Sequence, residues 1–272
     1  MTAAARLDAV AERLLDARAE ARCTARPTVE DPAFSLADAY AVAERHRQTR
    51  LARGERVVGY KIGFTNRGIW QRYGVHAPIW APVWNSTSTV LDGTTHSISL
   101  AGLCQPRLEP EIVFGFARAP RAGMTLAQLA GCIDWVAHGF ELVHTHFEGW
   151  RFAAADTVAD FSLHGHLVVG PRTPVARFAD LAADTAAIEL SLHEGLCHVE
   201  TGRANVVLDG PLNALRLWVD AMAEHTPQWA IEPGHMVTTG TITDAWPVVP
   251  GQHWHTALND ARLSGLRLST VG

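Results

Sequence analysis

The sequence lacks any apolar run that approaches the roughly 20 residues a helix needs to cross a bilayer. It also lacks a basic cluster: 23 Lys and Arg are set against 28 Asp and Glu, a formal net charge of −5. Because phosphate binding requires concentrated positive charge, this balance argues against nucleic acid as the main partner. Residues 1–23 contain no continuous apolar segment of the kind found in secretory signals. We therefore expect neither a membrane nor a nucleic-acid partner.

Cysteine is also scarce, and the four cysteines (Cys23, Cys104, Cys132 and Cys197) are widely spaced with no C-x-x-C pair. This spacing excludes a disulfide framework or a zinc knuckle and fits reduced thiols in a cytoplasmic protein. Cys104 is expected to be a buried thiol.

The motifs G-x-S-x-G, G-x-x-x-x-G-K-[ST] and G-x-G-x-x-G are absent. Serine hydrolases of that type, P-loop NTPases and dinucleotide enzymes therefore have no support.

The 272 residues are 47% hydrophobic and 19% charged, which is typical of a globular protein with a substantial core. Apolar residues at helical spacing begin with Leu7 and Val10, and Ser35 with Asp38 forms a capping box for a helix that runs to about Gly54. We expect a helical N-terminal region over residues 1–56.

From residue 57 onward, short apolar runs alternate with Gly and Pro, as in a β-rich protein. Helices are expected from Thr125, where Gln128 completes a capping box, and from Pro211, at an early helical position. The predicted fold class is α+β, with the helical N-terminal region on a mostly β body over residues 57–272.

Two glutamates stand out in this body. On a strand, Glu109 and Glu111 point to the same side, and the apolar residues 112–116 follow them. Burying both carboxylates unpaired would cost several kcal/mol, so a Lys or Arg, a shared proton or a divalent cation must compensate them. The alternative is an exposed edge strand, which Pro110 weakly favours.

A third carboxylate, Glu141, is expected at the head of another apolar segment. Three carboxylate ligands, with water and substrate completing the sphere, suit Mg²⁺ or Mn²⁺. They do not suit zinc, which prefers nitrogen and sulfur ligands.

Several segments together resemble one family. These are residues 37–42 (Ala-Asp-Ala-Tyr-Ala-Val), 59–63 (Gly-Tyr-Lys-Ile-Gly), 107–111 (Arg-Leu-Glu-Pro-Glu), 140–143 (Phe-Glu-Leu-Val), 155–160 (Ala-Asp-Thr-Val-Ala-Asp), 210–212 (Gly-Pro-Leu) and 239–241 (Thr-Gly-Thr). In order and spacing they resemble the fumarylacetoacetate hydrolase superfamily, in its 2-keto-4-pentenoate hydratase and 4-oxalocrotonate decarboxylase branch. The resemblance covers nearly the whole chain and implies a rolled mixed sheet.

The resemblance implies a Mg²⁺ or Mn²⁺ cofactor held by Glu109, Glu111 and Glu141. Such a metal would chelate the 1-carboxylate and 2-oxo groups of a small 2-oxo acid, and a Lewis acid there stabilises the enolate. Lys61 is the implied acid/base or charge-stabilising group, and we expect burial to lower its pKa.

The resemblance further implies substrate contacts from Arg107, Asp156 and Thr241. It also implies a homo-oligomer, with a complex with a sister enzyme as a further option.

The sequence also departs from the family pattern. The family's hydratases carry two aspartates in a loop where this chain has His76 and Ile79, and the D-S-R after the third ligand becomes His144-Thr145-His146. Since histidine is a proton shuttle near neutral pH, we predict that His76 or His144 relays the proton. Each histidine has a hydrogen-bonded structural role as its alternative.

Tryptophans flank the altered loop. Trp70, Trp80 and Trp84 are expected either to form an apolar lid over the substrate tail or to pack in the core.

The leading hypothesis is a metal-dependent lyase that hydrates a 2-hydroxy-2,4-dienoate to a 4-hydroxy-2-oxo acid in aromatic catabolism. The alternatives are decarboxylation of a 4-oxalocrotonate-like diacid, C–C hydrolysis of an acylpyruvate, and a weakly catalytic partner subunit.

Overall fold

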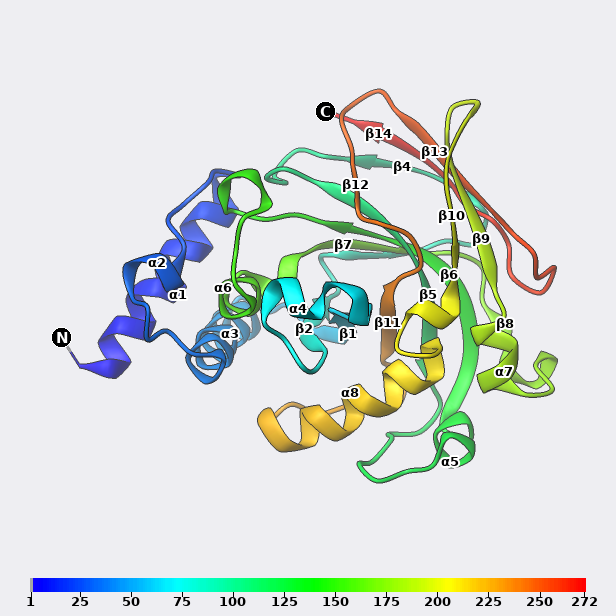
Figure 1. Cartoon of the computed structure of the whole chain (residues 1–272), viewed down its shortest axis with the longest axis horizontal. Helices are drawn as coiled ribbons and strands as arrows, with labels where there is room; N and C mark the ends of the chain where they lie inside the picture. Colours follow the sequence, from blue (N-terminus) through cyan, green and yellow to red (C-terminus); the bar gives the residue numbers. More distant parts are fainter. Residues whose placement is uncertain (1) are drawn as a thin grey trace.

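The computed structural model describes residues 2–272, apart from the side chain of Arg72. The chain begins with the helices α1 (Ala3–Ala19), α2 (Pro27–Glu30) and α3 (Leu36–Ala52), which form the end of the molecule nearest the N-terminus in Figure 1. The capping box of Ser35 and Asp38 is confirmed. Gly54, with φ +83°, follows α3 in the left-handed conformation that ends many helices. Leu7, Val10, Leu14 and Ala17 form the buried stripe of α1.

A mixed sheet forms the centre of the molecule. Among the described residues it has nine strands, in the order β2-β1-β11-β5-β6-β7-β3, with β12 paired to β5 and β8 paired to β6. Its strands are β1 (Val57–Gly63), β2 (Ile79–Trp84), β3 (Ser88–Val90), β5 (Arg107–Phe116), β6 (Ile133–Val143), β7 (His164–Val169), β8 (Thr173–Pro174), β11 (Met236–Thr241) and β12 (Trp246–Pro247). The long strands β5 and β6 curve strongly, so the sheet curls (Figure 1).

A second sheet covers one side of the first. Its strands in the described chain follow the order β10-β9-β13-β14-β4. They are β4 (Thr95–Ser99), β9 (Glu189–Glu194), β10 (Cys197–Arg203), β13 (His253–Leu258) and β14 (Arg267–Val271). The curled sheet, the second sheet and the N-terminal helices confirm the predicted α+β class.

The remaining helices lie around the sheets. They are α4 (Trp70–Tyr73), α5 (Leu126–Ala130), α6 (Ala154–Ala159), α7 (Leu181–Ala186) and α8 (Pro211–His225). The capping box of Thr125 and Gln128 and the N-terminal Pro211 are confirmed. Helix α8 packs against β1 and β11 through a buried stripe that includes Leu215 and Trp218.

Pro110 does not mark an edge strand. It lies in β5, which has neighbours on both sides, and its side chain is buried. Its carbonyl accepts a hydrogen bond from the Ile242 amide, so its N–H position points to the same side of β5. On that side the pairing with β11 shifts register between Thr238 and Thr241, so Pro110 lies next to an irregularity of the ladder, where proline is tolerated.

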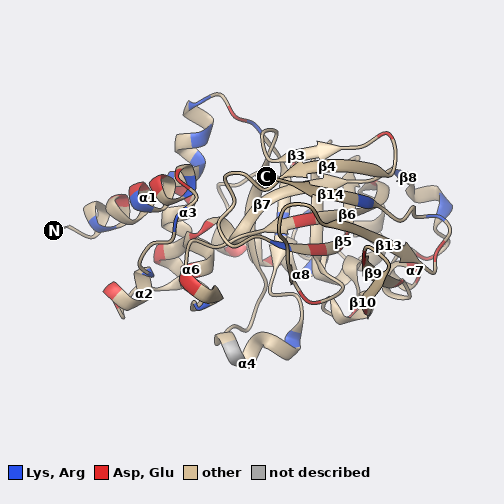
Figure 2. Cartoon of the chain, turned by 90° about the horizontal axis from the view of Figure 1, so that it is seen from above, with Lys and Arg blue, Asp and Glu red and all other residues tan. Residues whose placement is uncertain are grey.

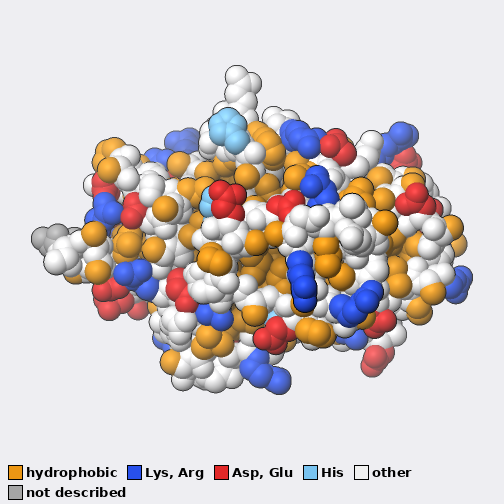
Figure 3. Space-filling view, turned by 90° about the horizontal axis from the view of Figure 1, so that it is seen from below, with side chains coloured by type: hydrophobic (Ala, Val, Ile, Leu, Met, Phe, Trp, Pro, Cys, Tyr) orange, Lys and Arg blue, Asp and Glu red, His pale blue; other side chains and the backbone are white. Residues whose placement is uncertain are grey.

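Charges of both signs are spread over the surface. Basic and acidic residues share the outside of α1, while acidic positions also occur within β5 and β6 (Figure 2). On the face in Figure 3, charged side chains of both signs are interspersed with apolar ones.

Within residues 2–272, no helix combines the length and the apolar composition that a membrane crossing requires. The division into regions 1–56 and 57–272 stays a prediction.

Candidate active site

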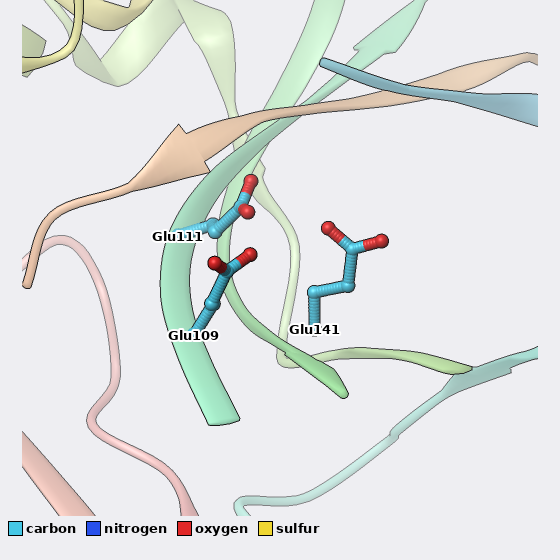
Figure 4. Close-up of side chains that lie close together, drawn as sticks. All are labelled: Glu109, Glu111 and Glu141. Atoms are coloured by element: carbon cyan, nitrogen blue, oxygen red, sulfur yellow. The ribbon is translucent and has the colours of Figure 1, made fainter. Parts of the chain in front are cut away.

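The three predicted glutamates lie together on the inner side of the curled sheet. Glu109 and Glu141 are direct cross-strand partners on β5 and β6, and Glu111 follows Glu109 by two residues. One carboxylate oxygen from each lies within 4.8 Å of the others. Figure 4 shows Glu109 and Glu111 leaving one strand, with the Glu141 carboxylate opposite them. Glu141 comes near the end of β6 and not, as expected, at the head of an apolar segment, because the apolar residues of β6 precede it.

Glu111 is fully buried and is held on one side only. Its Oε2 accepts hydrogen bonds from the Thr238 hydroxyl and, at 2.6 Å, from the Gly240 amide. Gly240 has φ +106°, and a Cβ there would lie 1.8 Å from the Thr65 hydroxyl oxygen. Glycine is therefore required where β11 presents its amide to Glu111. Among the described residues, Oε1 of Glu111 has no hydrogen-bond partner.

Glu141 is fixed by two cationic or hydrogen-bonding groups. The Lys61 ammonium lies 3.3 Å from its Oε2, and His164 Nδ1 lies 2.7 Å from its Oε1. Lys61 also donates to the Ser162 carbonyl at 3.1 Å. It is the only lysine in the chain, and it is 3% exposed.

The expectation that burial lowers the pKa of Lys61 is wrong. Burial acts in that direction, but the charges of Glu141, Glu109 and Glu111 outweigh it and raise the pKa above its usual value. For Glu141, burial opposes ionisation, yet Lys61 and His164 lower the pKa. Lys61 is therefore a firmly protonated cation in this structure.

The other two carboxylates are not compensated in this way. Burial, together with the Glu141 charge, raises the pKa of Glu109 to about 7 even though Lys61 acts against it. Burial and the charges of Glu141 and Glu109 raise the pKa of Glu111 well above its usual value. A divalent cation would remove this repulsion and satisfy the free oxygen of Glu111. The cluster therefore fits a hard, oxygen-binding metal ion.

A cavity of about 410 Å³ opens next to the cluster. Four of the nine predicted site residues line it: Lys61, Glu109, Arg107 and Thr241. Thr241 pairs with Glu111 across β11 and β5. The Arg107 guanidinium stacks on Trp150, with its carbon 4.1 Å from the ring centroid, and donates to the Ala245 carbonyl at 3.4 Å.

Asp156, predicted to contact substrate, is not among the residues that line the cavity. Its carboxylate is fully buried and accepts hydrogen bonds from the amide and hydroxyl of Thr28 and from the Ala153 amide. These bonds tie the segment of α2 to the start of α6, which is a structural task.

The two predicted proton-relay histidines also lie outside the cavity lining. His76 is exposed in the turn before β2. His144 is 1% exposed and lies between the Arg18 guanidinium, 2.9 Å from Nε2, and the Cys104 amide, which donates to Nδ1. Burial and the neighbouring Arg18, His146 and His164 hold the pKa of His144 well below its usual value.

Of the two expectations for the tryptophans beside the altered loop, core packing is confirmed and the lid is wrong. Trp80 and Trp84 are buried in β2, and Trp70 packs against the core while donating to the Phe64 carbonyl at 2.7 Å. The tryptophans that line the cavity are Trp150 and Trp246. No local pattern in the sequence distinguishes these two from the others.

His164 also belongs to the site, although no motif in the sequence pointed to it. This residue orients Glu141 through Nδ1, and its Nε2 lies 2.9 Å from the Thr87 hydroxyl. A ligand carboxylate that is itself hydrogen-bonded keeps a fixed orientation. No local sequence pattern could have identified it, because its contact with Glu141 depends on the pairing of β6 with β7.

Comparisons with known proteins agree with this site. No family model matches the sequence. The chain is 35% identical over 181 residues to a 2-hydroxyhexa-2,4-dienoate hydratase of Comamonas testosteroni, covering 66% of this chain and 67% of the relative. It is 30% identical to a 2-keto-4-pentenoate hydratase of Paraburkholderia phymatum, covering 87% of each chain.

A solved structure shows the same fold. It is the 4-oxalocrotonate decarboxylase of Pseudomonas putida G7, complexed with magnesium and adipate, with a TM-score of 0.90 at 24% identity. The match covers 100% of this chain and 99% of that one. The chain belongs to the fumarylacetoacetate hydrolase superfamily, in the branch of 2-keto-4-pentenoate hydratases and 4-oxalocrotonate decarboxylases.

Proposed function

We propose that this protein is a hydro-lyase that requires Mg²⁺ or Mn²⁺ and hydrates a 2-hydroxy-2,4-dienoate, through its 2-oxo tautomer, to a 4-hydroxy-2-oxo acid. The observation that carries the proposal is the cluster of Glu109, Glu111 and Glu141 beside the Lys61 ammonium, at the side of the cavity. The two hydratase relatives support the reaction type. The three glutamates are the proposed ligands of the ion.

When bound, such an ion supplies Lewis-acid polarisation of the 1-carboxylate and 2-oxo oxygens of the acid. Net hydration moves a proton to C5, adds hydroxide to C4 and places a proton on C3. The Lys61 ammonium beside Glu141 is proposed to stabilise negative charge that develops on the substrate oxygens. Arg107 and Thr241, which line the same cavity, are proposed to hold the substrate.

The proposal does not use His76 or His144 as the relay, because neither lines the cavity. Their predicted role stays a prediction. A water molecule that reaches the cavity is a sufficient proton carrier for the C3 and C5 transfers. The predicted homo-oligomer likewise stays a prediction.

One observation favours decarboxylation of a 2-oxo diacid as a second candidate. The Arg107 guanidinium lines the cavity and would attract a second carboxylate. The two reactions differ in their products, because decarboxylation releases CO₂ and hydration does not.

The experiment is an absorbance assay on 2-hydroxypenta-2,4-dienoate and on 4-oxalocrotonate, with CO₂ measured in parallel. We expect loss of the dienol signal without CO₂, dependent on Mg²⁺ or Mn²⁺ and abolished by a chelator. Glu109→Gln should abolish it as well, while the matched change at exposed Glu224 of α8 should not. Normal activity of Glu109→Gln would overturn the proposal, and so would CO₂ release as the main reaction.

A further inference from the structure

Four aromatic side chains line the cavity in a continuous series, which we call the aromatic wall: Phe64, Tyr73, Phe152 and Trp150. The ring centroids are 5.2 Å apart for Phe64 and Tyr73, 5.5 Å for Tyr73 and Phe152, and 5.9 Å for Phe152 and Trp150. Each of the four is only partly buried, so part of each ring is open to the cavity. Phe64 and Tyr73 lie between β1 and β2, and Trp150 and Phe152 lie between β6 and α6, so the wall joins two stretches that are far apart in the chain.

Few of the residues that line the cavity are charged. Among the described lining residues, Lys61 and Arg107 are the only cations. Lys61 is engaged by Glu141, and Arg107 already stacks on Trp150 of the wall. Asp244 also lines the cavity and would repel an anionic tail.

The cavity is large enough for a substrate that carries a tail beyond the five-carbon acid. A cavity of about 410 Å³ lies within the range that suits ligands larger than a five-carbon acid. Aromatic side chains bind flat apolar groups through buried area and ring–ring contacts, which reward an aryl group more than a short alkyl group.

Resting on the proposed function, we propose that the preferred substrate is a 2-hydroxy-2,4-dienoate that carries an aryl tail on C5 and no second carboxylate, and that the aromatic wall selects it. For the C5-phenyl acid, one water is added and nothing is lost. Water supplies the hydroxyl that bonds to C4 and the proton added at C5. The proton lost from the 2-hydroxyl is matched by one added at C3, so the C2–C3 enol becomes the 2-oxo group and the C3 methylene of 4-hydroxy-2-oxo-5-phenylpentanoate.

The test measures binding separately from turnover. Calorimetry in the presence of Mg²⁺ compares 2-oxopentanoate, 2-oxo-5-phenylpentanoate and 2-oxoadipate, none of which can be hydrated. We expect the phenyl acid to bind about tenfold more tightly than the other two. Phe152→Ala should remove most of this preference, and Phe152→Tyr, which keeps the ring, should retain it.

Equal binding of the three acids, or tighter binding of 2-oxoadipate, would overturn the inference. Turnover of 2-hydroxypenta-2,4-dienoate and its C5-phenyl analogue then separates the two proposals. Hydration of the parent acid with no preference for the phenyl acid rejects the aryl tail alone. Preferential binding of the phenyl acid without hydration of either substrate rejects the proposed reaction and leaves the aryl selectivity standing.

A second inference rests on a different part of the molecule. The thiols of Cys23 and Cys104 are free, but their sulfur atoms lie 3.7 Å apart. Cys23 is exposed in the segment after α1, while Cys104 is buried just before β5. Gln105 adjoins this pair, and its side-chain amide approaches Cys23 Sγ at 3.6 Å.

Hydrogen bonds of Gln105 connect the cysteine pair to Trp150 of the aromatic wall. The Gln105 side chain donates to the Thr145 and Phe147 carbonyls and accepts from the Gly149 amide at 2.8 Å, and its backbone carbonyl accepts from Trp150 Nε1 at 3.0 Å. A crosslink at this point would tie the N-terminal helices to the segment that carries Trp150.

We infer that Cys23 and Cys104 form an intramolecular disulfide when the protein meets a peroxide. The Cys23 thiolate attacks one peroxide oxygen and releases water or hydroxide, which gives a sulfenic acid. The Cys104 sulfur then attacks the Cys23 sulfur, the S–S bond forms, and a second water leaves. Two thiols are oxidised and one H₂O₂ is reduced to two waters.

Treatment with stoichiometric H₂O₂, followed by intact and peptide mass spectrometry, tests this inference. We expect a loss of two hydrogen masses, a linked peptide pair containing Cys23 and Cys104, and a higher Tm that dithiothreitol reverses. Cys23→Ser should abolish all three changes, and Cys197→Ser, at the other exposed cysteine, should abolish none. Gain of oxygen without a crosslink, or crosslinking only between molecules, would overturn the assignment.

Discussion

The Lys61 ammonium lies 3.3 Å from Oε2 of Glu141, although their strands are not neighbours. In the sheet, β11 and β5 separate β1 from β6, and three strand spacings in a flat sheet amount to about 14 Å. The curl of the sheet therefore brings these two side chains together on its inner side. Each loses its surrounding water, and removal of either partner would leave the other as an uncompensated buried charge.

Lys61→Met should lower kcat by about 10²- to 10⁴-fold, because no other described cation contacts Glu141 on the side of the cavity. Lys61→Arg retains the charge but not the fit of the ammonium, and we expect an intermediate loss. Steady-state kinetics on the dienoate measures both, with circular dichroism as the folding control. A wild-type kcat for Lys61→Met would contradict the assigned role.

The protonation state of Lys61 is directly measurable because the chain has a single lysine. Reductive methylation with ¹³C-formaldehyde places one NMR label on it and another on the α-amino group. Without divalent cations, we expect the pKa of Lys61 to lie above its ordinary value, since the carboxylates outweigh burial. Mg²⁺ should lower it, because the ion offsets the same carboxylates. An ordinary or depressed value without metal would disprove this electrostatic account.

His164→Gln should weaken Mg²⁺ binding by about 10- to 100-fold, because the Glu141 carboxylate loses the ring that orients it. The matched control is His166→Gln: His166 lies two residues away on β7 and is within 3.0 Å of the Thr89 hydroxyl. Calorimetric titration with Mg²⁺ distinguishes the two variants. Equal affinities would show that His164 has no positioning role.

Metal binding should stabilise the fold more strongly as the pH rises. Burial raises the pKa of Glu109 from 4.5 to about 7, so between these values the folded state binds more protons than the unfolded state. Without metal, this group therefore makes stability fall as the pH increases through that window. Mg²⁺ competes with those protons, and we expect the rise in Tm on adding Mg²⁺ to be larger at pH 8 than at pH 5. The same Tm increment at both pH values would show that Mg²⁺ does not compete with protons at Glu109.

Acid should destabilise the fold through His138, which is buried between the Glu111 carbonyl and the Thr256 hydroxyl. Burial lowers its pKa from 6.5 to about 4, so the unfolded state binds more protons between these values. Stability contributed by the neutral ring is present above pH 6.5 and is lost as the pH falls toward 4, by about 3 kcal/mol. Urea unfolding of His138→Gln should show a flatter dependence over this window. An unchanged pH slope would assign the acid sensitivity to other groups.

The sequence allowed prediction of every feature that depends on local spacing. The capping box at Ser35, the start of α8 at Pro211 and the shared side of Glu109 and Glu111 follow from the 3.6-residue and two-residue periods of helix and strand. The metal cluster was predictable from the same spacing of Glu109 and Glu111, together with the apolar residues around Glu141 and the family resemblance.

The lining of the cavity followed no such local rule. Trp80 and Trp84 are close in sequence to the altered loop but belong to the core, whereas Trp150 enters the site from a distant segment. Asp156 and His144 were predicted as site residues from short motifs, as Lys61 and Arg107 were. In the structure they bond instead to Thr28 and Arg18 of the N-terminal helices. Periodicity determined which side of a strand each side chain takes. Only the curl of the sheet and the packing of remote segments decided which of those sides enclose the cavity, because these depend on contacts between residues far apart in the chain.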